Sequence, residues 1–140
     1  MKKLLGLDVS SSTIGWCLVE YDDKTEHLIS YGHIKPPKST NGSLAFRALK
    51  YSNILKALLK LENPDFVAIE SYASRFPKGK STARTIITLS LFNEVTSMGC
   101  IEVLNFEPTS YAVSTIRATL SKMSNTKIVS KEEAYDYTSK

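Results

Sequence analysis

The sequence predicts one α/β domain built on a five-stranded mixed sheet: a three-strand antiparallel meander, two parallel strands, and helices on both faces. Three observations carry this prediction. Two short apolar segments, residues 4–7 and 66–69, each run into an acidic residue, which is typical of a buried strand that meets a loop. Residues 43–61 repeat apolar side chains at helical spacing. At 140 residues and 42% hydrophobic composition, the chain suits one domain with a real core.

The first three strands follow from the N-terminal part of the chain. Residues 3–8 form the first strand, and a small, hydroxyl-rich turn leads to a second strand over residues 15–21. Asp22-Asp23-Lys24-Thr25 is a hairpin turn into a third strand over residues 27–34, which two prolines end. Together these strands predict the meander.

A long helix is predicted next, over residues 43–61, with Ser43 as its N-cap and Asn63-Pro64 closing it. Its apolar positions recur every three or four residues: Leu44, Ala48, Tyr51, Leu55, Leu58 and Leu59. The fourth strand, residues 66–70, then returns the chain to the sheet.

The second half of the chain alternates helix and strand. A helix is predicted over residues 82–98 with Gly99 as its stop, followed by a fifth strand over residues 100–105. Pro108 starts a third helix that runs to residue 120, and residues 130–133 form a capping box that opens a fourth. This order predicts helices on both faces of the sheet.

Asp8 and Glu70 are the candidate metal ligands. Each ends a predicted central strand, so the sheet can bring both carboxylates to one rim. Two convergent carboxylates suit a hard divalent cation such as Mg²⁺, with Mn²⁺ as the alternative. Two plainer interpretations stand beside this one: an Asx-type turn at Asp8 and a solvated Glu70 where the strand meets its loop. The repetition of the pattern favours the metal interpretation.

Charge and cysteine content narrow the function classes. The 18 Lys and Arg against 14 Asp and Glu give a net charge of +4, which by itself indicates nucleic acid only weakly. Cys17 and Cys100 lie in apolar stretches without a CxxC motif, so we expect core thiols and a reducing cytoplasm. We expect no signal peptide, no apolar run long enough to span a membrane, and no membrane partner.

The order strand–Asp–hairpin, meander, helix and strand–Glu resembles the ribonuclease H-like fold. Within that superfamily the chain is similar to RuvC-type Holliday-junction resolvases over nearly its whole length. The residues that carry the similarity are Gly6-Leu7-Asp8-Val9-Ser10 with Gly15-Trp16, and Pro64-Asp65-Phe66-Val67-Ala68-Ile69-Glu70. Looser matches lie at residues 107–117 and at the Ser130-Lys131 helix start.

This resemblance implies a structure-selective DNA endonuclease that hydrolyses phosphodiesters with two metal ions. Asp8 and Glu70 match metal-binding carboxylates of the family, and Lys131 matches a lysine that acts at the scissile phosphate. An aromatic wedge follows the strand-four acid in the family; Tyr72 or Phe76 fits it here, unless these rings only pack their loop. The nucleic-acid-binding residues expected are Tyr72, Arg75, Phe76, Lys78, Lys80, Arg84 and Arg117, the last at a position that is usually Lys.

The resemblance further implies branched DNA as the partner and a bacterial or phage-infected cytoplasm as the location. Two symmetric cuts imply a homodimer, with the apolar residues of helix 82–98 as its surface. Resolvases of this type complete their site with two acids on a final helix, and this chain ends at Lys140 before such a helix. Glu133 and Asp136 have i, i+3 spacing but come too soon after Lys131. We therefore expect a truncated nuclease domain, residues 1–140, whose own activity and remaining carboxylates stay open.

Two other function classes stay open. Gly6-x-Asp8-x-Ser10 also resembles the first phosphate loop of actin-like ATPases and sugar kinases, which share the fold but need a second domain and further Gly-rich loops. Only Gly79 and Gly99 lie beyond Gly42, and neither sits in such a loop. A non-catalytic module that binds branched DNA through the same fold is the third class.

Overall fold

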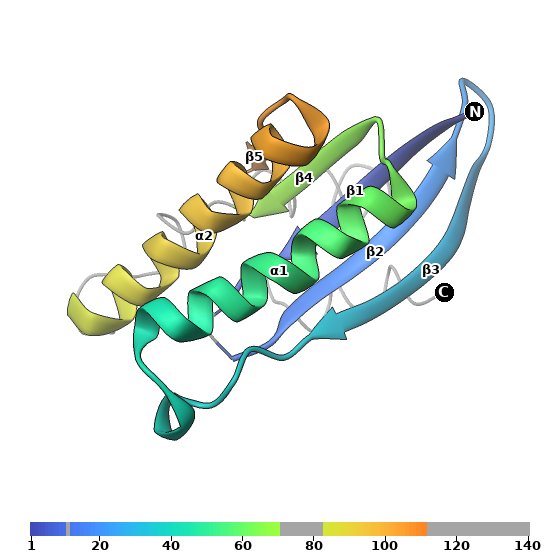
Figure 1. The fold of residues 1–140 in the computed structure, drawn as a ribbon. Helices are drawn as coiled ribbons and strands as arrows, with labels where there is room; N and C mark the ends of the chain where they lie inside the picture. The colour runs from blue at the N-terminus through green and yellow to red at the C-terminus, as the bar shows by residue number, and fades with distance from the viewer. Residues whose placement is uncertain (11, 71–82, 112–140) are drawn as a thin grey trace, which may run out of the picture.

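The computed structural model describes residues 1–10, 12–70 and 83–111. They form one five-stranded sheet and two long helices (Figure 1). The elements in chain order are β1 (Lys2–Asp8), β2 (Ile14–Tyr21), β3 (Glu26–Ile34), the 3₁₀ turn η1 (Ser39–Asn41), α1 (Leu44–Glu62), β4 (Phe66–Glu70), α2 (Ala83–Leu104) and β5 (Thr109–Tyr111).

The sheet has the order β3-β2-β1-β4-β5. β1 pairs antiparallel with β2, and β2 with β3, whereas β1, β4 and β5 run parallel. The meander therefore supplies three strands and the later chain adds two on the other side of β1. The predicted α/β fold with its mixed five-stranded sheet is confirmed.

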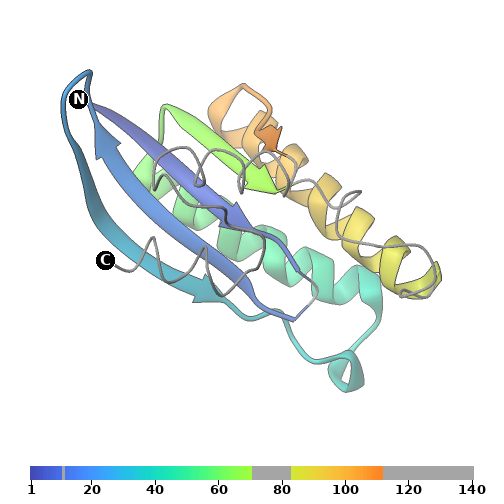
Figure 2. The same cartoon turned by 180° about the vertical axis from the view of Figure 1, so that it is seen from behind.

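One face of the sheet carries the core. Leu5 and Leu7 of β1 and Val67 and Ile69 of β4 are buried on this face, in one cluster with residues of α1 such as Leu55. Both helices cover this face: they lie in front of the sheet in Figure 1 and behind it in Figure 2. Helices were also predicted over residues 108–120 and from residue 130, on a sheet with helices on both faces, but residues 112–140 lie outside the described part.

The fifth strand is not where the sequence predicted it. α2 continues through Gly99 to Leu104, and β5 follows at Thr109–Tyr111, so the predicted strand over residues 100–105 and the helix start at Pro108 are wrong. Gly99 is buried against α1, where an added Cβ would lie 3.4 Å from Leu55 Cδ2. Gly99 thus allows α1 and α2 to pack closely, and it does not end α2. The helix ends instead at Asn105, which has a φ of 66° and donates its N–H to Ile101 O at 3.0 Å.

α1 begins and ends as the sequence predicted. Ser43 Oγ accepts the Phe46 N–H at 3.1 Å, which makes Ser43 the N-cap. Asn63 adopts the left-handed conformation, with a φ of 45°, and donates its N–H to Leu59 O. The chain then turns directly into β4.

A buried polar chain joins the two helices. Thr96 Oγ1 donates to Phe92 O at 2.7 Å, so Tyr51 Oη donates to Thr96 Oγ1 at 2.6 Å. The Tyr51 and Phe92 rings stack with centroids 5.4 Å apart. Burial raises the pKa of the Tyr51 hydroxyl above its ordinary range.

α2 is also long and apolar enough to cross a membrane, judged by length and composition alone, with a mean hydropathy of 1.3. The expectation that no apolar run reaches this length is therefore wrong. The core helix of a soluble protein passes the same criterion, and here α2 packs along α1 through Phe92, Thr96 and Cys100.

Candidate active site

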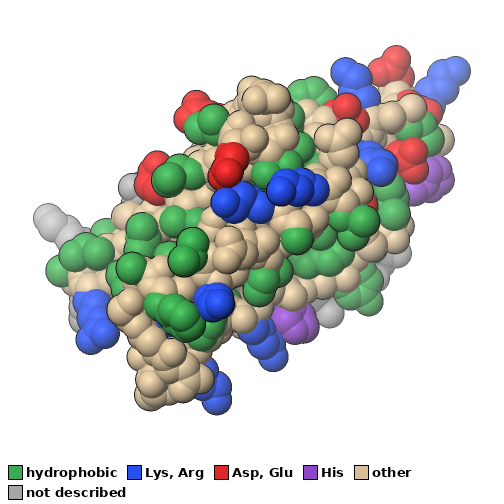
Figure 3. Space-filling view, in the orientation of Figure 1, with side chains coloured by type: hydrophobic (Ala, Val, Ile, Leu, Met, Phe, Trp, Pro, Cys, Tyr) green, Lys and Arg blue, Asp and Glu red, His purple; other side chains and the backbone are tan. Residues whose placement is uncertain are grey.

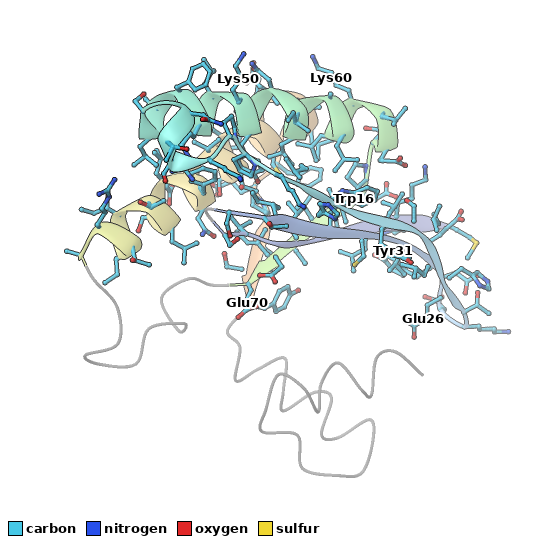
Figure 4. The ribbon with its side chains drawn as sticks, turned by 90° about the horizontal axis from the view of Figure 1, so that it is seen from below. Trp16, Glu26, Tyr31, Lys50, Lys60 and Glu70 are labelled. Carbon is cyan, nitrogen blue, oxygen red and sulfur yellow. The ribbon has the colours of Figure 1, made fainter. Side chains whose placement is uncertain are left out.

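Asp8 and Glu70 lie side by side at the ends of neighbouring parallel strands. Asp8 is the last residue of β1 and Glu70 the last of β4, and the register pairs Leu7 with Ile69 immediately before them. Because side chains alternate along a strand, both carboxylates are on the face opposite Leu7 and Ile69, away from the helices. Figure 4 shows Glu70 on the far side of the sheet from Lys50 and Lys60 of α1.

Two hydrogen bonds fix this register at the other end of the strands. The Lys3 N–H donates to Asp65 Oδ2 at 2.8 Å, and the Asp65 N–H donates to Lys3 O at 2.9 Å. Asp65 thus clamps the start of β4 to β1. A slip of one residue would turn Glu70 toward the helices, so this clamp helps to keep the carboxylates together.

A shallow hollow of about 320 Å³ opens beside the two carboxylates. It is lined by Gly6, Leu7, Asp8, Gly15, Trp16, Cys17, Ala68, Ile69, Glu70 and Tyr111. Small side chains form much of it, and a Cβ added at Gly6 would lie 3.1 Å from Cys17 Sγ. Asp8 is exposed and Glu70 half-buried, so a ligand can reach both.

Tyr111 is a member of this hollow that sequence reasoning missed. It pairs with Glu70 across β4 and β5, and its side chain is 44% exposed. The error in placing the fifth strand hid it. The β-prone segment Thr109-Ser110-Tyr111 directly after a Pro could have indicated a strand.

The two carboxylates fit part of a metal site. Carboxylate oxygens are the donors that Mg²⁺ and Mn²⁺ prefer. Within residues 1–10, 12–70 and 83–111, no group of three or more His, Cys, Asp or Glu side chains could hold a metal ion. Asp8 and Glu70 therefore supply two protein ligands, and the metal role remains a prediction.

The hydroxyl-rich turn after Asp8 has a structural role. Ser10 Oγ donates to Thr13 O at 2.5 Å and accepts the Thr13 N–H at 3.1 Å, which closes the turn between β1 and β2. The Ser10 hydroxyl is thus engaged in the turn. This use weakens the comparison with a phosphate loop, which would direct such groups to a nucleotide.

Most of the other predicted site residues lie outside the described part of the chain. These are Tyr72, Arg75, Phe76, Lys78, Lys80, Arg117 and Lys131, as well as Glu133 and Asp136. Arg84 is described: it lies in the first turn of α2, exposed, and does not line the hollow beside the carboxylates.

No family model and no curated protein matches the sequence. Solved structures do. The chain is similar to T. thermophilus RuvC in complex with a Holliday junction substrate, with a TM-score of 0.79 and 14% identity over 98% of this chain and 77% of that one. It is also similar to the yeast mitochondrial Holliday junction resolvase Ydc2, with a TM-score of 0.61 and 13% identity over 87% and 55% of the two chains.

A third similarity is to the Aquifex aeolicus Ppx/GppA phosphatase, with a TM-score of 0.52 and 9% identity over 89% of this chain and 41% of that one. At these identities the similarities define the fold. The chain has a ribonuclease H-like fold of the RuvC resolvase type, as the sequence predicted.

Proposed function

We propose that this protein is a metal-dependent nuclease that cleaves branched DNA. The observation that carries the proposal is the parallel pairing of β1 with β4, which sets Asp8 beside Glu70 at a shallow hollow. The similarity to two solved Holliday-junction resolvases supports the substrate class.

In this proposal Asp8 and Glu70 would hold divalent cations, two in the complete site. Such ions, when bound, lower the pKa of water and stabilise the leaving oxygen of a phosphodiester. The chain itself contributes access and position. Gly15 keeps bulk away from Asp8, and the strand register holds Glu70 next to Asp8. Lys131 would stabilise the scissile phosphate, by the resemblance alone.

We further propose a two-fold dimer through the outer side of α2. Ile87, Met98 and Ile101 are 62%, 64% and 47% exposed, and their spacings of 11 and 14 residues place them on one side of the helix. An apolar stripe of this kind on α2 suits burial against a second copy.

The decisive test is cleavage of a labelled four-way junction with Mg²⁺ or Mn²⁺. Where paired symmetric nicks form, we expect a loss of at least about 100-fold in Asp8→Asn and Glu70→Gln, because metal stabilisation supplies several kcal/mol of the barrier. Glu26→Gln, which removes a carboxylate at the start of β3, is the matched control and should cleave normally. Full cleavage by Asp8→Asn would contradict the metal role.

Two further measurements separate the remaining outcomes. Binding of Mn²⁺ measured by electron paramagnetic resonance should weaken in Asp8→Asn even if no nicks form. If the unmodified chain cleaves, Glu133→Gln and Asp136→Asn show whether those acids contribute. Junction binding without nicks or Mn²⁺ binding would instead favour the non-catalytic binding module.

The similarity to a Ppx/GppA phosphatase supports a second candidate function, that of a nucleotide-binding domain of the actin-like ATPase type. Isothermal titration with ATP and Mg²⁺ tests it. Saturable ATP binding that is lost in Asp8→Asn would favour this candidate over the nuclease.

A further inference from the structure

A second concave surface lies on the helix side of the sheet. It has a volume of about 1090 Å³ and is formed by the segment that follows β3, the first turns of α1, and the first turns of α2. We call it the basic groove. Its described lining residues are Ser12, Lys35, Pro36, Pro37, Lys38, Ser39, Thr40, Gly42, Ser43, Leu44, Arg47, Arg84, Thr85, Ile87 and Thr88.

The charge of this groove is one-sided. Four of its lining residues are cations (Lys35, Lys38, Arg47 and Arg84), and among the described lining residues none is Asp or Glu. The remaining side chains are mostly hydroxyls, which can donate hydrogen bonds to an anion. Figure 3 shows Lys and Arg side chains, and no acidic ones, at the end of this face where α1 and α2 begin.

The helices add to the positive potential. α1 and α2 both begin at the groove, where the exposed backbone N–H groups of a helix carry partial positive charge. Neither helix has an acidic residue in its first turn, and Arg84 occupies a position in α2 where a carboxylate would be favoured. Such an arrangement concentrates positive potential in the groove.

One wall of the groove is fixed in place. Arg47 is half-buried; its Nε donates to Pro37 O at 2.7 Å, and its guanidinium carbon lies 6.0 Å from the Phe92 ring centroid. A hydrogen bond of 2.8 Å from the Asn41 N–H to Lys38 O closes the loop at η1. Lys35, Lys38 and Arg84 are exposed, so they extend from a preformed wall.

The groove and the carboxylates share one end of the sheet. Ser12, in the turn between β1 and β2, lines the groove, whereas Asp8, which begins that turn, lines the hollow on the opposite face. Lys35 directly follows Ile34, and Ile34 pairs with Ile14 at the same end. A chain of phosphates in the groove could therefore pass over this turn toward Asp8.

We propose that the basic groove binds the sugar-phosphate backbone of a DNA arm on the helix side of the sheet, in continuity with the carboxylate site. The inference rests on the proposed function, and it adds Lys35 and Lys38 to the predicted interface. The described lining residues offer cations and hydroxyls, which are groups that contact phosphates. Binding through it is independent of base sequence and steeply salt-dependent.

The first test measures the salt dependence of junction binding by fluorescence anisotropy, in an Asp8→Asn background without metal. We compare Lys35→Gln/Lys38→Gln with the matched pair Lys24→Gln/Lys60→Gln, whose lysines are exposed at the other end of the molecule. The groove pair should lower the slope of log K against log salt by about 1.8, since each phosphate contact contributes about 0.9. Equal slopes for the two pairs would overturn the proposal.

The second test leaves every cation in place. A photo-cross-linker on Thr40→Cys, in a Cys17→Ser background, should attach to the DNA backbone, whereas the same reagent on Asn53→Cys, exposed on α1 and outside the groove, should not. Cross-linking from both positions, or only from Asn53→Cys, would count against the groove. If Asp8→Asn abolishes nicking but the groove variants change neither the salt slope nor the cross-linking, only this inference is wrong. If Asp8→Asn nicks as well as the unmodified chain, only the proposed function is wrong.

Discussion

The two faces of the sheet use the same strands in opposite ways. Along β1, Leu5 and Leu7 are 0% and 5% exposed beneath the helices, while Gly6 and Asp8 between and after them face the hollow. The helix face depends on filling space with apolar side chains, and the site face depends on leaving space beside a carboxylate. Neighbouring residues of one strand thus serve the two purposes in turn: one side chain stabilises the core and the next faces the candidate site.

The largest effect that tests this separation comes from Leu5→Ala. We expect the free energy of unfolding to fall by about 2–5 kcal/mol, because a fully buried side chain is replaced by a cavity in the main core. Asp8→Asn, on the same strand but the other face, should change it by less than about 0.5 kcal/mol. Urea denaturation followed by circular dichroism measures both. Similar losses in the two variants would mean that Asp8 is part of the core structure.

A smaller effect comes from adding bulk to the site face. Gly6→Ala would place a Cβ 3.1 Å from Cys17 Sγ, so we expect a loss of about 1–2 kcal/mol in unfolding free energy through crowding. Cys17→Ala should be nearly neutral alone and should restore most of the loss in the double variant. A double-variant cycle by urea denaturation gives the coupling. Additive losses would show that the two side chains do not compete for the same space.

A further comparison concerns the buried Cys100 and the dependence of stability on alkaline pH. Burial raises the pKa of the Cys100 thiol from its ordinary 9.0 to about 11. The folded protein therefore keeps this thiol neutral while the unfolded chain ionises it. Its contribution to stability is complete below pH 9 and is lost as the pH rises to about 11.

The free energy of unfolding is measured between pH 8 and pH 11 for Tyr51→Phe with and without Cys100→Ala. Tyr51→Phe serves as the background because Tyr51 also has a raised pKa. Cys100→Ala should flatten the alkaline decline. A half-exposed Cys17 should also react with a thiol reagent in the folded state well before the buried Cys100. Equal reaction of both thiols would contradict the burial of Cys100 between α2 and the rest of the core.

The sequence alone determined the meander, α1 and β4 to within one or two residues. The patterns that predict these elements lie within short stretches of sequence, so no distant partner is needed to recognise them. They are apolar alternation, the Ser43 cap, the Asn63-Pro64 helix end and an acid after each apolar run. The adjacency of Asp8 and Glu70 followed because parallel strands carry their final residues to the same edge.

Only the tertiary structure decided the rest. Gly99 looks like a helix stop in sequence, but in the structure it is the point where α1 packs closely against α2. α2 therefore runs on to Leu104, and β5 with Tyr111 follows later than predicted. The basic groove likewise joins segments about 40 residues apart, Lys35 to Arg47 and Arg84 to Thr88. Neither can be read from a local pattern, because each is defined by which surfaces the packing of α1 against α2 brings together.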